Sequence, residues 1–168
     1  MLGRRLLLFL LVAMTAWIPH AGAGAMGGWS WPVVGPVIRG FDPPSMPYGA
    51  GHRGIDIATA FGTPVRAPAS GVVTFAGPVA GALFVSVDHG EGVVSSYSWV
   101  SSVLVRRGDL VGAGAVLALS GAGHPGVDPA HLHFGVKRDG VYVDPLSLLA
   151  PASVVGLIRL VPVPSGSV

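Results

Sequence analysis

Short runs of apolar and β-branched residues, separated by turn-forming glycine, proline and aspartate, occupy most of the middle of the chain. Such runs predict β-strands, because they are too short for typical helices and end at turn signals. The predicted strands lie at residues 64–68, 72–76, 83–88, 93–100, 116–120, 131–137 and 141–143. Asp144 followed by Pro145 favours one short helix through Leu149. Many short strands at this spacing predict an all-β fold, either an antiparallel β-sandwich or an open barrel.

The first 25 residues have the pattern of a secretory signal peptide. Two arginines precede an apolar stretch at residues 6–16, and small residues then allow cleavage after Ala23 or Ala25. The alternative is an uncleaved membrane anchor, but Pro19 ends the apolar run well short of the about 20 residues that a spanning helix needs. The mature chain is therefore expected to have no stable transmembrane anchor and to be secreted, in the extracytoplasmic cell envelope.

Two segments flank the strand-rich part of the chain. Residues 26–50 are rich in tryptophan, proline and glycine, and predict an extended lead-in with turns. Trp29 and Trp31 are expected to pack this lead-in against the sheet rather than to bind a ligand. Residues 150–168 predict a C-terminal edge strand, at about 157–161, followed by a frayed tail.

The composition narrows the classes of function. Hydrophobic residues make up 51% of the chain and charged residues 11%, which is enough apolar material for a buried core. Every acidic residue follows Ala25, so removal of Arg4 and Arg5 with the signal leaves 8 basic residues (10 − 2) against 8 acidic ones. A formally neutral mature chain argues against nucleic-acid binding. The absence of cysteine excludes a thiol nucleophile and a cysteine-ligated zinc.

Two clusters of potential metal ligands stand out among the six histidines. His52 and Asp56 are four residues apart, and the glycine and isoleucine before Asp56 favour a tight turn leading into a strand over a helix. His131 and His133 are expected to project from the same face of a strand, because side chains alternate with a period of two. Taken alone, His52 and Asp56 are typical of solvated or capping groups near a turn, and His131 and His133 can be an exposed pair at the end of a sheet.

Together the two clusters predict a zinc site. His52, Asp56 and His133 supply two imidazole nitrogens and one carboxylate oxygen. Zinc accepts that set with a fourth position open for water, which is the arrangement of catalytic sites and not of closed structural ones. Bound zinc lowers the pKa of that water to roughly 7 and polarises a carbonyl. His131, beside the third ligand, can then act as a general base or as a hydrogen-bond donor.

These segments resemble the LytM/lysostaphin family of zinc endopeptidases. The family signature is H-x-x-x-D followed far downstream by H-x-H, and four residues fit it in order: His52, Asp56, His131 and His133. Other features of the family recur around the signature: Pro64-Val65-Arg66-Ala67, Gly71-Val72-Val73, Val87-Asp88-His89-Gly90, Gly108-Asp109-Leu110-Val111 and Val143-Asp144-Pro145. The resemblance covers about residues 36–149, which are taken as the LytM-like domain.

The resemblance implies a fold, a cofactor and a substrate. The fold would be the β-rich duplicated hybrid motif, with a groove across one sheet. His52, Asp56 and His133 would hold one zinc ion per chain, and His131 would be catalytic. The substrate would be peptide bonds in the stem or cross-bridge of bacterial peptidoglycan, which agrees with secretion because that substrate lies outside the membrane.

The chain departs from the family at one catalytic position. Active members carry a second catalytic histidine in a Y-x-H segment, and here the segment is Tyr97-Ser98-Trp99. An indole accepts no proton, although its N–H can donate to an oxyanion. Two hypotheses follow: a working endopeptidase with His131 as its catalytic histidine, or a zinc- and wall-binding module that regulates other cell-wall hydrolases. Retention of all three metal ligands favours the enzyme.

Four residues near the clusters are candidate contacts for a substrate or an oxyanion: Trp99, Tyr97, Arg53 and His124. Each has a plainer interpretation. Trp99 can simply fill space beside the groove, and Arg53 can face solvent. His124 can replace the missing histidine, or it can be an exposed loop residue. His89 is expected to have a structural role within its hairpin loop.

A third class of function has less support. The Pro-Val-Arg-Ala-Pro-Ala-Ser-Gly segment also resembles the lipoyl and biotinyl carrier barrels. Those carriers need a modified lysine at a hairpin tip, whereas the only lysine of the chain, Lys137, lies within the H-x-H strand. A carrier also has no need of a secretory signal, so this resemblance indicates only a related β-barrel geometry.

Overall fold

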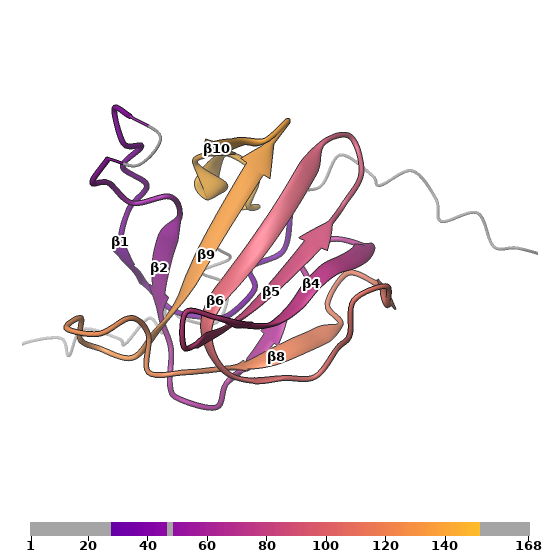
Figure 1. The fold of residues 1–168 in the computed structure, drawn as a ribbon, viewed down its shortest axis with the longest axis horizontal. Coiled ribbons are helices and arrows are strands. Elements are labelled where there is room, and N and C mark those ends of the chain that lie inside the picture. The colour runs from indigo at the N-terminus through magenta and orange to yellow at the C-terminus, as the bar shows by residue number, and fades with distance from the viewer. Residues whose placement is uncertain (1–27, 47–48, 152–168) are drawn as a thin grey trace, which may run out of the picture.

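Ten strands and one turn of 3-10 helix make up the part of the chain that the computed structural model describes, residues 28–46 and 49–151 (Figure 1). The elements are β1 (Val37–Arg39), β2 (Ile55–Ala58), β3 (Pro64–Arg66), β4 (Gly71–Val79), β5 (Ala82–Asp88), β6 (Val93–Val103), β7 (Leu110–Val111), β8 (Val116–Ser120), β9 (His131–Arg138), β10 (Val141–Val143) and the helical turn η1 (Pro145–Ser147). The predicted signal peptide and the edge strand at 157–161 lie outside the described residues.

The strands form one antiparallel sheet that does not close on itself. The main order is β1-β2-β9-β6-β5-β4-β7, with β10 on β9 and with β8 pairing both β3 and β6. The longest strand, β6, lies in its middle between β9 and β5, and it sets the register of these neighbours. The predicted all-β antiparallel architecture is therefore confirmed.

The strand bounds follow the sequence pattern closely, while the predicted helix is shorter than expected. Residues 116–120 and 141–143 form strands with the predicted bounds. Only Pro145–Ser147 is helical, with the side chain of Asp144 accepting a hydrogen bond from the backbone of Leu146. The helix stops there because the following backbone turns to pair with Trp29. Among the described residues no helix is long and apolar enough to cross a membrane.

The core lies on one side of the long strands. Its largest fully buried side chains include Tyr97, Phe134 and Leu132, which alternate with groove-facing residues along β6 and β9. Trp29 and Trp31 pack against this core, as predicted, and Trp31 Nε1 donates a hydrogen bond of 2.9 Å to the carbonyl of Ala150. The lead-in and the end of the described chain are thus held together over the same side of the sheet.

Candidate metal centre and groove

Three segments bring the candidate metal ligands together. Backbone hydrogen bonds pair His52 with Asp42 just before β2, and Asp56 is the second residue of β2. In the β2–β9 register Asp56 lies directly opposite His133. The sequence expectation of a tight turn into a strand is therefore realised, and the strand pairing supplies the third side chain.

The ligand atoms converge at short distances. His52 Nε2 lies 3.0 Å from both Asp56 Oδ1 and His133 Nδ1, and His133 Nδ1 lies 2.8 Å from Asp56 Oδ1. The other nitrogen of His52, Nδ1, lies 2.7 Å from the carbonyl of Gly40. A carbonyl only accepts, so His52 Nδ1 carries the proton and Nε2 presents a lone pair to the cluster.

This donor set fits a tetrahedral ion. Zinc bonds of about 2.05 Å place neighbouring ligand atoms about 3.3 Å apart, so the three atoms need to separate by only a few tenths of an ångström. Without an ion, the proton of His133 Nδ1 is shared between a carboxylate oxygen and an imidazole lone pair. A cation at this point satisfies all three atoms at once. Among the described residues, His52, Asp56 and His133 form a group that could hold a metal ion.

Asp56 is held in its charged form although it has no exposed surface. Burial by itself raises the pKa of this carboxyl, but hydrogen bonds from His133 and His124 and the charge of the imidazoles outweigh burial. The pKa of Asp56 therefore lies well below its ordinary value. An ionised carboxylate is the form that ligates a metal.

A second pair of histidines lies on the other side of Asp56. His124 Nε2 is 3.0 Å from Asp56 Oδ2, the oxygen that does not face the first two histidines. The ring of His124 is 4.6 Å from that of His131, measured between centroids. Asp56, His124 and His131 also form a group that could hold a metal ion. The loop histidine that the sequence left between two interpretations is thus part of the cluster.

His131 has no exposed surface. Its Nδ1–H donates to the carbonyl of Pro129 at 2.9 Å, and its Nε2 accepts from the backbone N–H of His124 at 3.3 Å. Gly123 lies directly over the ring, where a Cβ would come within 2.2 Å of it, and its φ of +88° suits glycine. In this conformation the segment at residues 123–124 separates His131 from the groove.

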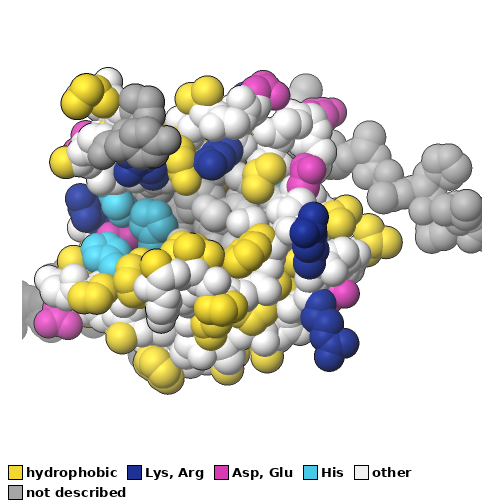
Figure 2. Space-filling view, viewed as in Figure 1, with side chains coloured by type: hydrophobic (Ala, Val, Ile, Leu, Met, Phe, Trp, Pro, Cys, Tyr) yellow, Lys and Arg dark blue, Asp and Glu magenta, His cyan; other side chains and the backbone are white. Residues whose placement is uncertain are grey.

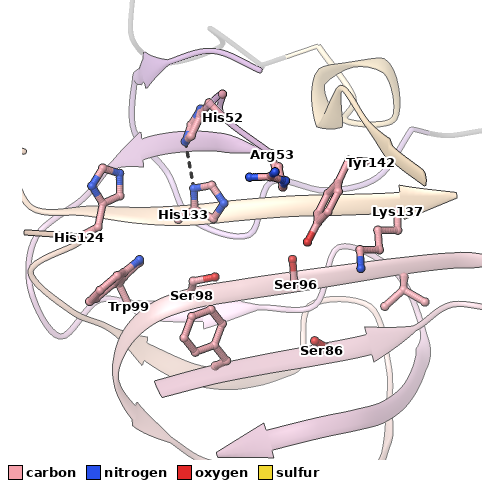
Figure 3. Close-up of a pocket in the computed structure, with 13 residues that line it drawn as sticks. His52, Arg53, Ser86, Ser96, Ser98, Trp99, His124, His133, Lys137 and Tyr142 are labelled. Carbon is pink, nitrogen blue, oxygen red and sulfur yellow. Dashed lines mark hydrogen bonds between the residues drawn. The ribbon is translucent and has the colours of Figure 1, made fainter. Parts of the chain in front are cut away.

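A groove of about 430 Å³ runs from this cluster along the outer face of β9, β6 and β5. Figure 2 shows the histidines gathered at one end of a hollow, with Lys and Arg side chains along its rim. His52, His133, His124 and Trp99 line the end near the metal ligands. Lys137 and Tyr142 lie at the other end, and Arg53, Ser96 and Ser98 lie between the two ends (Figure 3).

A β-bulge turns Trp99 toward the groove. In the β5–β6 register Ser98 pairs with Phe84 and Val100 pairs with Leu83, which leaves Trp99 as an extra residue. Its φ of +62° is unusual for a residue other than glycine. Trp99 consequently lines the groove together with Ser98, and its ring lies 6.3 Å from that of His124. Figure 3 shows the indole nitrogen on the side that faces the histidines.

Two other residues singled out from the sequence have different surroundings from those expected. Tyr97 is fully buried against Phe134 and has no surface for a substrate, so the proposed substrate or oxyanion contact is wrong for this conformation. Strand alternation explains this, since Tyr97 lies between two groove-facing serines. His89 has the expected structural role, but its partners are the carbonyl of Ser70 and the hydroxyl of Ser95, outside its own loop.

Comparison with known proteins identifies the family of this chain. The model of Peptidase family M23 matches residues 50–145, which include the four signature residues. The chain belongs to Peptidase family M23. An uncharacterized protein of Mycobacterium tuberculosis, Rv2891, is 39% identical over 98% of this chain and 66% of its own length. The murein hydrolase activator NlpD of Salmonella typhimurium is 33% identical over 74% of this chain and 32% of its own length.

Solved structures of M23-type peptidases have the same fold. A zinc-containing peptidase from Vibrio cholerae superimposes with a TM-score of 0.61 at 30% identity, over 71% of this chain and 39% of that one. The catalytic domain of lysostaphin from Staphylococcus simulans gives a TM-score of 0.55 at 28% identity, over 64% of this chain and 86% of that domain. The predicted resemblance to LytM/lysostaphin-type peptidases is therefore confirmed. This chain spans less than two thirds of the curated relatives named above.

Proposed function

We propose that this M23 protein is an extracytoplasmic zinc endopeptidase that cleaves peptide bonds in the stem or cross-bridge of bacterial peptidoglycan. One observation carries the proposal: three ligand atoms of His52, Asp56 and His133 lie within 3.0 Å of one another at the end of an open groove. The polar floor of the groove suits an extended peptide. The predicted signal peptide supports the location, and similarity to the murein hydrolase activator of Salmonella typhimurium supports a cell-wall substrate.

The metal centre would consist of one zinc ion held by those three residues. When bound, zinc supplies Lewis acidity toward a carbonyl and toward water. The hydrogen bond from His52 Nδ1 to Gly40 orients one ligand, and the hydrogen bond from His124 to Asp56 Oδ2 orients another. These contacts would hold the donor set in place before a substrate arrives.

We propose that His124 and His131 accept the proton that water loses during hydrolysis. The carboxylate of Asp56 only accepts, so His124 Nε2 carries a proton and its Nδ1 keeps a lone pair that can take a proton from water. His131 Nε2 likewise keeps a lone pair, because Nδ1–H donates to Pro129. His131 acts as the catalytic histidine when residues 123–124 shift, and the indole N–H of Trp99 donates to developing negative charge.

A peptidoglycan digest tests the proposed activity. Zinc-loaded protein is incubated with purified peptidoglycan, and the products are identified by mass spectrometry. New peptide amino termini are expected, and a chelator or His131→Ala should lower their rate of formation by at least about a hundredfold. His124→Ala should lower it by about tenfold or more if this side chain replaces the missing histidine. No product at one equivalent of zinc would contradict the proposal.

A regulatory role is the second candidate, and Trp99 favours it because the resemblance to LytM/lysostaphin-type peptidases implies a catalytic histidine at this position. In that case the protein would release nothing itself but would raise the rate of a partner cell-wall hydrolase. His131→Ala would keep this effect. Trp99→His separates the candidates further, since a gain of hydrolysis in that variant would show that the remaining site is intact.

A further inference from the structure

We propose that the end of the groove away from the metal ligands binds a carboxylate of the substrate, so that the protein selects acidic peptides over uncharged ones. This inference rests on the proposed peptide substrate and names its chemical class. The residues that carry it are Lys137 and Tyr142 at that end, with Arg53 between them and the metal ligands (Figure 3).

The floor of the groove is built for an extended chain. On β9 the groove-facing positions are His133, Gly135 and Lys137, because side chains alternate along a strand. The β6–β9 register places Ser98 opposite His133 and Ser96 opposite Gly135. A Cβ at Gly135 would lie 2.8 Å from Ser96 Oγ and 3.0 Å from the carbonyl of Arg53, so glycine lets these two groups pack closely against β9 in the middle of the floor. Small polar residues therefore connect the metal end to the cationic end.

Apart from the metal ligands and His124, the charged residues that line the groove are all positive. Lys137 and Arg53 line the groove, and no aspartate or glutamate is among its lining residues in the described part of the chain. In the strand register Asp88 lies opposite Val94, and its carboxylate accepts a hydrogen bond of 2.8 Å from the N–H of Gly90. Arg53 Nη2 donates a hydrogen bond of 3.2 Å to the carbonyl of Gly49, so an anion site at the far end depends on Lys137, which has no carboxylate beside it among the lining residues that the structure describes.

Tyr142 positions the lysine. In the β9–β10 register Tyr142 lies directly opposite Lys137, and Lys137 Nζ lies 4.6 Å from the centre of the tyrosine ring. A cation over an aromatic ring is held in place while its remaining donors stay able to bind an anion. Lys137 is also the only lysine in the sequence, so the single primary amine among the side chains lies in this groove.

The spacing sets the position of the carboxylate relative to the bond cleaved. His133 and Lys137 are four residues apart on one strand, which corresponds to about 13 Å. An extended peptide advances about 3.3 Å per residue, so the anchored carboxylate lies within about four residues of the scissile bond. A stem peptide with free carboxylates meets this requirement, whereas an uncharged glycine cross-bridge does not.

Peptide binding tests the proposal separately from hydrolysis. Calorimetry on the zinc-loaded protein compares a muropeptide-derived tetrapeptide that has free carboxylates with the same peptide after amidation. We expect the acid to bind about five- to tenfold more tightly, and the preference to weaken as salt rises. Lys137→Gln should reduce the preference below about twofold. Arg138→Gln is the matched control, because Arg138 is the exposed next residue on β9 and does not line the groove, and it should keep the full preference.

The unique lysine gives a second readout. Reductive methylation with ¹³C labels Lys137 and the amino terminus, and the lysine resonance should shift when the acid is added but not when the amide is added. Equal affinities, absence of binding by both peptides, or an unchanged preference in Lys137→Gln would overturn the carboxylate site. Cleavage of both peptides at equal rates would overturn it while leaving the endopeptidase intact. Selective binding without cleavage would keep the carboxylate site and remove the endopeptidase.

Discussion

Two regions of the molecule use histidine in opposite ways. His89 lies among the turns at the far side of the sheet from the groove residues, and both of its ring nitrogens have partners. Nδ1 is 2.9 Å from the carbonyl of Ser70, Nε2 is 2.8 Å from Ser95 Oγ, and the ring packs against Trp29. At the metal centre, His52 satisfies one nitrogen with a carbonyl and directs the other toward a carboxylate and a second imidazole.

The difference shows what separates a structural histidine from a ligand. A histidine whose two nitrogens are paired with a donor and an acceptor needs nothing more. A histidine whose free lone pair meets other acceptors requires a proton or a cation among them. The hydroxyl of Ser95 also bonds to that of Tyr97 at 2.9 Å, so the His89 network ends within the core instead of opening to a groove.

The largest expected effect is the loss of metal from the ligand set. His52→Ala should lower zinc affinity at least about a hundredfold and reduce the zinc content from one equivalent to nearly none. His89→Ala should keep one equivalent. Metal analysis of both purified variants, with circular dichroism as a check of folding, measures this contrast. An unchanged zinc content in His52→Ala would refute the site.

In the free energy of unfolding, the structural histidine His89 should matter more than a histidine of the metal end. His89→Ala removes two hydrogen bonds and the ring contact with Trp29, and it should lower the free energy of unfolding by about 2–3 kcal/mol. His124→Ala, at a partly exposed loop position, should cost less than about 1 kcal/mol in metal-free protein. Urea denaturation of the metal-free variants measures both values. Equal losses would mean that the loop histidine is as structural as His89.

A smaller effect is expected where backbone covers His131. Gly123→Ala places a methyl group within 2.2 Å of the imidazole at a φ of +88°, so the loop must move. We expect a loss of about 1–2 kcal/mol of stability and an increase in the solvent accessibility of His131. Histidine hydrogen–deuterium exchange, measured at the ring, reports that accessibility. Protection equal to that of the unaltered protein would show that residues 123–124 are not the cover.

The smallest effect is a pH dependence. Burial lowers the pKa of His89 below 6.5, partly opposed by hydrogen bonding to Ser70 and by the charge of Asp88. Between the folded and unfolded pKa values the unfolded chain binds more protons, so stability is lost as pH falls below about 6.5. The contribution is at most about 1.4 kcal/mol per pH unit. Denaturation of metal-free protein from pH 7.5 to pH 5 should give a shallower dependence for His89→Gln than for the unaltered chain.

Local pattern in the sequence was sufficient for most of the fold. The runs at 116–120 and 141–143 became strands with the expected bounds, because each is a short apolar segment closed by turn residues. The short strands β1 and β7 were not predicted, since three and two residues carry no period that can be recognised. The helix after Asp144 was overestimated because its end depends on pairing with Trp29, far away in the chain.

In the candidate site, too, some features could be predicted from the sequence and others depended on the tertiary structure. Residue chemistry and spacing alone indicated His52, Asp56 and His133 as ligands, because few donor sets with that composition suit anything but a metal. Two features depended on the tertiary structure. The β-bulge turned Trp99 out of strand alternation and into the groove, and the loop before β9 placed His124 on Asp56 and over His131. Both arise from contacts between segments distant in sequence, and no local pattern encodes such contacts.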